Sequence, residues 1–210
     1  SLMQGFGLMG LEAMSCGVAA IMSKSGGVED YANDENSILV NICEVTKFAD
    51  AIEKQWEYLQ SLGQKECSKA GVVSLLKLIS EFTAKGYVKD RQLVVEVFAA
   101  LFDIQVRDFA IGAHGKQLLI THWNMWRWLL RMAPEKNVPS VSSIFAILSY
   151  ERGDGALAHR ALDRALANDS QYSLALLLRR TFSAGWPPEA FCKMREELHP
   201  KISEEILGAA

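Results

Sequence analysis

The first 72 residues of this 210-residue sequence contain no arginine and no proline. All ten arginines and all five prolines come later, whereas five lysines and ten acidic residues lie before residue 73. The first part carries a net charge of −5, against +2 for the remainder. A single domain does not usually divide its arginines so sharply. We therefore predict two units of different origin, residues 1–72 and residues 73–210.

Long hydrophobic runs, strong net charge and closely spaced cysteines are also missing. No apolar run is long enough to span a bilayer, and we see no signal peptide. The net charge of −3 gives no reason to expect nucleic acid or an anionic membrane as a partner. The four cysteines lie far apart in the sequence, which predicts reduced thiols, a cytoplasmic protein and no metal site: Cys16, Cys43, Cys67 and Cys192.

A glycine-rich stretch occupies residues 4–31. The turn Gly5-Phe6-Gly7 opens into a short apolar helix, and a strand-like run follows at residues 18–23. Glycines beside a helix N-terminus let backbone N–H groups approach an anion, and the helix dipole favours negative charge there. On spacing alone this pattern fits a seat for a diphosphate, and it fits an ordinary tight α/β turn as well.

The residues themselves resemble the donor-binding half of GT-B glycosyltransferases of the retaining, family-4 type. The signature E-G-F-G-L-x-x-L-E-A-M-A-x-G of that family reads QGFGLMGLEAMSCG here, at residues 4–17. A Gly-Gly turn and an acidic loop follow, and the match continues through residues 33–40. The resemblance implies a partial Rossmann-like α/β fold for residues 1–72, with a nucleotide diphosphate sugar as ligand and no metal.

The resemblance also implies roles for individual residues. Glu12, the second acid of the family's carboxylate pair, would hold the nucleotide ribose. The backbone amides of the glycine turn would face the diphosphate: Gly5, Phe6, Gly7 and Leu8. The first acid, which meets the donor sugar in the family, is Gln4 here, and an amide cannot act as an acid or base near neutral pH. The motif begins at residue 4, without the acceptor-binding domain, so we expect weak donor binding and no sugar transfer from this chain alone.

From residue 73 onward only helical periods are visible. Apolar stripes at three- and four-residue spacing predict helices at residues 74–84, 90–102, 116–132, 141–152, 155–168 and 172–184. Earlier in the chain, similar patterns predict a strand at residues 37–41 and helices at residues 45–62 and 64–70. Asp154 is placed to cap the helix that follows it. We predict an all-α bundle for the second unit and a predominantly helical chain overall.

This helical half resembles a second family, the actinobacterial domain of unknown function 4192. The resemblance covers residues 90–191 and rests on the strings GDGALA at 153–158, ALDRALA at 161–167 and GWPP at 185–188. The family carries no assigned activity, so the resemblance implies a fold more than a function. Two helices rich in small residues in this segment also resemble a tetratricopeptide unit, but one pair of helices is too few to indicate a repeat array.

The densest aromatic cluster is the segment HWNMWRW at residues 122–128. Trp123, Trp126 and Leu130 can share one helix face, with Trp128 on another, so we interpret the cluster as core packing plus one interfacial tryptophan. A stacking platform for nucleic-acid bases is the alternative, with Arg127 and Arg131 four residues apart as its cations, but the overall charge does not favour it.

Few polar residues of the helical half have the spacing expected of a catalytic or metal-binding site. His159 and Asp163 lie four residues apart, which suits an acid/base or metal pair as well as a surface ion pair. His114, His122 and His199 have no acid or cysteine at the spacing of zinc ligands. We therefore predict no metal centre in this half.

Three interpretations stay open. The chain is a nucleotide-sugar-binding remnant of a glycosyltransferase fused to a helical domain, or a non-enzymatic helical structural or interaction protein that self-associates or binds another protein. The third interpretation is an artificial junction of two unrelated pieces, which the uneven distribution of arginine and proline would fit as well.

Overall fold

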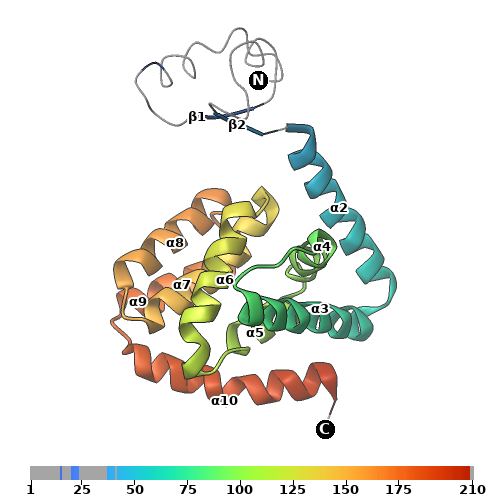
Figure 1. The fold of residues 1–210 in the computed structure, drawn as a ribbon. Coiled ribbons are helices and arrows are strands. Elements are labelled where there is room, and N and C mark those ends of the chain that lie inside the picture. The colour runs from blue at the N-terminus through green and yellow to red at the C-terminus, as the bar shows by residue number, and fades with distance from the viewer. Residues whose placement is uncertain (1–14, 16–19, 24–36, 41, 209–210) are drawn as a thin grey trace. The chain divides into compact units, whose positions relative to one another are not determined.

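The computed structural model describes residues 15, 20–23, 37–40 and 42–208. Contacts along the chain divide it into two compact units, residues 1–51 and 52–210. The described residues are predominantly helical, as the sequence predicts (Figure 1). Among the helices of these residues we find no candidate for a membrane-spanning segment.

The described part of the first unit contains two short strands, β1 (Ala20–Ser23) and β2 (Ser37–Val40). They pair in parallel, with Ala20 opposite Ser37 and Ser23 opposite Val40. Both strands fall where the sequence predicts them. A parallel pair requires a crossover connection, and residues 24–36, which make that connection, lie outside the described residues. Of the region predicted to be Rossmann-like, residues 1–72, the structure otherwise describes only Ser15 and the residues from 42 onward, so that fold stays a prediction.

The helices that follow are connected by short segments. Helix α2 (Ile42–Ser61) crosses from the first unit into the second. The second unit continues with α3 (Gln64–Lys85), α4 (Arg91–Ala100), α5 (Ile104–Gly112), α6 (Leu119–Met132), α7 (Val138–Glu151), α8 (Gly155–Asn168), α9 (Ser173–Ser183) and α10 (Pro188–Leu207). Single 3₁₀ turns, Lys116–Leu118 and Glu135–Asn137, precede α6 and α7.

Aspartate side chains start three of these helices. The Asp90 and Asp154 carboxylates accept hydrogen bonds from Leu93 N at 3.2 Å and from Leu157 N at 2.9 Å. Asp103 does the same for α5. Each carboxylate satisfies a backbone N–H that has no partner within its helix. The predicted capping role of Asp154 is confirmed.

Helix α7 lies in the centre of the second unit, in contact with α5, α6, α8, α9 and α10 (Figure 1). Every residue from Val138 to Tyr150 is buried. A helix that is hydrophobic on all sides belongs in a protein core. Its buried serines include Ser143 and Ser149, which donate to the carbonyl oxygens of Pro139 and Phe145 one turn earlier in the same helix.

Beyond shifts of a few residues at helix ends, the observed helices differ from the predicted ones in two ways. The helices predicted at residues 64–70 and 74–84 form one continuous helix, α3. Helices α5 and α10 were not predicted; α5 has only nine residues, and α10 is highly charged and contains Pro200 in its interior. The proposed boundary after residue 72 concerns the origin of the two parts and stays a prediction.

Candidate functional site

The site predicted from the glycosyltransferase-like motif lies outside the described residues. This applies to all its members: Gln4, Gly5, Phe6, Gly7, Leu8 and Glu12. Of the surrounding motif, the structure describes β1, β2 and the helical residue Ser15. The roles of Glu12 and of the glycine turn therefore stay predictions.

The aromatic segment at residues 122–128 divides between core and surface, as interpreted. Trp126 and His122 are each 1% exposed. Trp123 is half-buried and donates from its indole N–H to Ser149 Oγ at 3.1 Å. Trp128 is half-buried on another face of α6, with its ring centroid 5.7 Å from that of Phe82. No stack of accessible rings forms along α6, because these rings point to different neighbours.

His159 and Asp163 do not form a pair with each other. The Asp163 carboxylate accepts from the guanidinium of Arg179, an ion pair whose two side chains are well exposed. The His159 ring lies edge-on to the ring of Phe182, with the centroids 6.4 Å apart. The surface ion pair is the interpretation that the structure supports.

The structure assembles a buried polar cluster that sequence spacing did not show. Arg195 Nε of α10 donates to Glu151 Oε1 at 2.8 Å, and His114 Nε2 lies 3.2 Å from Glu151 Oε2. The side chains of Arg195, Glu151 and His114 are 3%, 4% and 1% exposed. Arg195 also donates to the backbone oxygen of His114 at 3.0 Å. The cluster ties α10 to the end of α7 and to the connection between α5 and α6.

Two further histidines face this cluster. The ring of His122 lies 5.2 Å from that of His114, and neither of its nitrogens has a hydrogen-bond partner among the described residues. The ring of His199 lies 4.8 Å from Phe109, and its Nδ1 likewise has no partner there. Three of the four histidines in the sequence thus meet at one place, although 85 residues separate the first from the last.

Burial and charge set the protonation of the cluster. Burial, together with the nearby His114 and Arg195, lowers the pKa of His122 to about 4. Burial alone would raise the pKa of Glu151, but the hydrogen bonds from His114 and Arg195 and the positive charge of Arg195 lower it overall. Burial raises the pKa of the neighbouring Cys192 thiol. At neutral pH the cluster therefore holds an ionised Glu–Arg pair, a neutral His122 and a protonated thiol.

This arrangement is suited to holding helices together rather than to catalysis. Glu151 is engaged by two donors, and a protonated thiol is a poor nucleophile. Among the described residues no group of three or more His, Cys, Asp or Glu side chains could hold a metal ion. Two of the partners, Glu151 and Arg195, lie 44 residues apart and share no motif, so no sequence pattern pointed to them.

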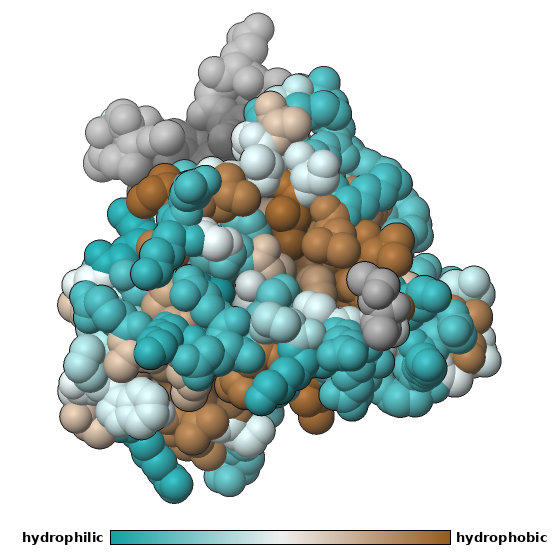
Figure 2. Space-filling model, turned by 90° about the horizontal axis from the view of Figure 1, so that it is seen from below, coloured by the Kyte–Doolittle hydropathy of each residue, from teal (hydrophilic) through white to brown (hydrophobic). Residues whose placement is uncertain are grey.

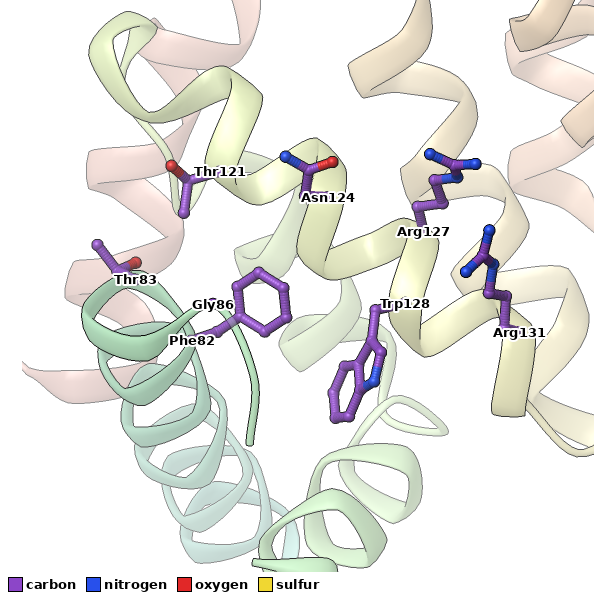
Figure 3. A pocket seen from close by; sticks show the side chains of 8 residues that line it. All are labelled: Phe82, Thr83, Gly86, Thr121, Asn124, Arg127, Trp128 and Arg131. Carbon is purple, nitrogen blue, oxygen red and sulfur yellow. The ribbon is translucent and has the colours of Figure 1, made fainter. Parts of the chain in front are cut away.

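A cavity of about 450 Å³ opens between the C-terminal end of α3 and helix α6 (Figure 3). Its lining combines two arginines, two aromatic rings and three neutral polar side chains: Phe82, Thr83, Gly86, Thr121, Asn124, Arg127, Trp128 and Arg131. Gly86 ends α3 with a φ of 76° and donates its N–H to Phe82 O at 2.7 Å. That left-handed turn brings the chain away from α3 beside the cavity. No acidic residue lines it.

Comparisons with known proteins matched two family models. The model described as Glycosyl transferases group 1 matches residues 1–62, and the one described as Domain of unknown function (DUF4192) matches residues 40–189. No curated protein and no solved structure matched the chain. Both resemblances inferred from the sequence are confirmed, and the second match begins well before residue 90. Because that model covers more than half of the sequence, the chain belongs to the DUF4192 family.

Proposed function

We propose that the N-terminal part of this chain is a nucleotide-sugar-binding remnant of a retaining glycosyltransferase, joined to a helical domain. The match to the glycosyltransferase model over residues 1–62 is the observation that carries this proposal. The stretch includes Glu12 and the Gly5–Leu8 turn, whose residue types agree with the family signature at those positions. The parallel pairing of β1 and β2 is also what a crossover unit of a nucleotide-binding half requires.

Binding without sugar transfer is the activity expected of this remnant. Gln4 occupies the position of the acid that meets the donor sugar in the family. Its amide is neutral at all ordinary pH values and cannot supply the charge of a carboxylate. Glu12 retains its carboxylate, which can accept hydrogen bonds from the two ribose hydroxyls.

Isothermal titration calorimetry with uridine diphosphate and guanosine diphosphate tests the proposal. We expect weak binding by the unaltered chain and a loss of about tenfold in affinity for Glu12→Ala, because a charge-assisted hydrogen bond is lost. Arg160→Gln, an exposed change on α8, is the matched control and should leave the affinity unchanged. Flat traces from both the unaltered chain and Glu12→Ala would end the proposal.

A second candidate function, self-association through the helical unit, is favoured by an apolar groove. A cavity of about 180 Å³ lies along α9 and α10, lined largely by aliphatic side chains such as Leu177, Leu198 and Ile202. Leu177 and Leu198 remain 61% and 46% exposed beside it. Figure 2 shows that hydrophobic side chains reach the surface on the face seen from below. Apolar surface that remains in water at a groove favours association with another protein surface.

Light scattering across a concentration series tests this candidate. We expect the average mass to rise with concentration for the unaltered chain and to stay at that of a monomer for Leu177→Ser. Ile120→Ser, a change at a side chain of similar exposure (56%) on α6, is the control. A monomer at every concentration would rule out self-association through this groove.

A further inference from the structure

We propose that the cavity between α3 and α6, the α3–α6 pocket, binds a small organic phosphate that carries a planar ring, as a nucleoside monophosphate does. The pocket lies entirely in the helical unit. It shares no residue with the glycosyltransferase-like motif, so this inference goes beyond the function proposed above and does not depend on it.

The charge in the pocket comes from two arginines on α6. Arg127 and Arg131 lie one turn apart, and like charges at this spacing repel each other. Both side chains are exposed, and neither forms an ion pair with a described residue. Arg127 instead lies over the ring of Trp123, at 5.3 Å from its centroid. An anion bound between the two guanidinium groups would relieve their repulsion.

Guanidinium groups are well matched to phosphate. Each presents a planar fork of N–H donors that can bind two phosphate oxygens at once. Figure 3 shows the side chains of Arg127 and Arg131 on the same side of α6, with their guanidinium groups turned toward a common region. No carboxylate competes for them within the pocket. The pair can therefore act as one anion site.

The other end of the pocket offers flat apolar surface. Phe82 and Trp128 point toward each other from α3 and α6, at 43° between ring planes (Figure 3). Phe82 is buried at 5% exposure, whereas Trp128 is half-buried, and both side chains line the cavity. An offset contact with a flat ring is a favourable arrangement for an indole. This part of the lining would receive the ring of the ligand.

Neutral hydrogen-bonding groups lie beside the aromatic pair. The hydroxyls of Thr83 and Thr121 and the amide of Asn124 line the same cavity. These groups both donate and accept, as recognition of sugar hydroxyls and base edges requires. The volume of about 450 Å³ lies within the range of pockets that bind small molecules.

A second cationic cavity in the helical unit shows why the arginines of the α3–α6 pocket are distinctive. That cavity, of about 190 Å³, contains Arg107 and Lys136. Arg107 donates to the Asp108 carboxylate at 2.7 Å, and Lys136 is paired with Glu53. Both cations already have a carboxylate partner, so this cavity does not present two cations to an incoming anion.

Calorimetric titration of the full chain with five compounds tests the proposal: adenosine monophosphate, uridine monophosphate, ribose 5-phosphate, inorganic phosphate and adenosine. We expect the two nucleotides to bind with dissociation constants below about 1 mM. Ribose 5-phosphate and inorganic phosphate should bind more weakly, and adenosine should not bind measurably. Affinity for the nucleotides should fall as salt is added, because exposed charges carry part of the interaction.

Three variants locate the binding. Arg127→Gln and Arg131→Gln should each weaken nucleotide binding about tenfold, since each removes a charge-assisted contact. Trp128→Leu should weaken the binding of nucleotides but leave that of inorganic phosphate unchanged. Arg160→Gln removes an exposed arginine from α8 and should have no effect. Unchanged helical circular dichroism shows that each variant is folded.

Several outcomes would overturn the inference. The inference fails if none of the phosphate compounds binds at millimolar concentration. It also fails if the unaltered chain and both arginine variants bind the nucleotides with equal affinity. Ribose 5-phosphate binding as tightly as the nucleotides would overturn the assignment to a ligand with a planar ring. Nucleotide binding that is lost in Glu12→Ala and kept in the arginine variants would support the glycosyltransferase-like motif and reject the α3–α6 pocket.

Discussion

The side chain of His122, on α6, is buried at 1% exposure. Both its ring nitrogens lack a hydrogen-bond partner among the described residues. Its pKa falls from an ordinary 6.5 to about 4 in the folded chain. Between these values the unfolded chain binds a proton that the folded chain does not, so stability decreases as the pH falls from 6.5 toward 4. The shift corresponds to roughly 3 kcal/mol for the complete interval.

Urea unfolding measured at several pH values checks this expectation with the variant His122→Phe. Phenylalanine fills a similar volume and does not titrate, so the variant should lose less stability than the unaltered chain between pH 6.5 and pH 4. At pH 7 it should be at least as stable, because a buried ring without hydrogen-bond partners is replaced by an apolar one. Parallel pH profiles for the two proteins would contradict the assignment.

Glu151 and Arg195 form a buried ion pair between α7 and α10. Replacing Arg195 by Met leaves a buried carboxylate at 4% side-chain exposure without its main counter-charge. We expect a loss of about 3–5 kcal/mol in the free energy of unfolding. The double variant Glu151→Leu/Arg195→Met should be less destabilised than the sum of its single changes, because both charges are removed together. Additive losses in chemical denaturation would show that the two residues are not coupled.

Among the helices, the contact between α5 and α10 depends on a glycine. A Cβ atom at Gly112 would lie 2.3 Å from His199 Nδ1 and 2.6 Å from His199 Cβ. Gly112→Ala should therefore cost about 1–3 kcal/mol by forcing α10 away. Gly155→Ala is the matched control, because nothing lies within 4 Å of its added Cβ at the start of α8. The control should be neutral or slightly stabilising in thermal unfolding, and equal midpoints for the two variants would contradict the packing seen here.

Sequence patterns predict a helix most accurately where its local sequence preferences and its tertiary packing favour the same residues. Helix α8 has the predicted bounds because Asp154 caps it and a regular apolar stripe runs along it. The start of α7 was missed, since the prediction began at residue 141 and the helix already contains Pro139 in its first turn. Helix α10 was missed altogether: it has many charged residues, and Pro200 lies inside it. Tertiary packing of Phe191, Cys192 and Ile206 overrides those local preferences.

The candidate sites likewise contain parts that the sequence predicts and parts that it does not. The spacing of Arg127 and Arg131 on one helix was visible in the sequence. Their cavity was not, because its other wall comes from Phe82 and Gly86, about forty residues earlier. His114, Glu151 and Arg195 meet only through the packing of three separate segments. Sequence periodicity describes single helices and carries no information on which helices become neighbours.

Across the whole molecule, the two family matches overlap at residues 40–62. This overlap coincides closely with α2, Ile42–Ser61, which is one continuous helix. The change in composition after residue 72 falls within another continuous helix, α3. A helix therefore continues without a break both through most of the overlap of the two family matches and through the change in arginine and proline content.

Because the helical unit, residues 52–210, forms a compact body with its own core, it should fold without the N-terminal motif. A shortened chain beginning at residue 40, where the DUF4192 match starts, retains α2 and all later helices. We expect its circular dichroism to show a higher helical fraction than that of the full chain, with a thermal midpoint for the helical transition within a few degrees. If the shortened chain instead has little helix or aggregates on purification, the helical unit depends on residues 1–39, and the division into two self-sufficient units is wrong.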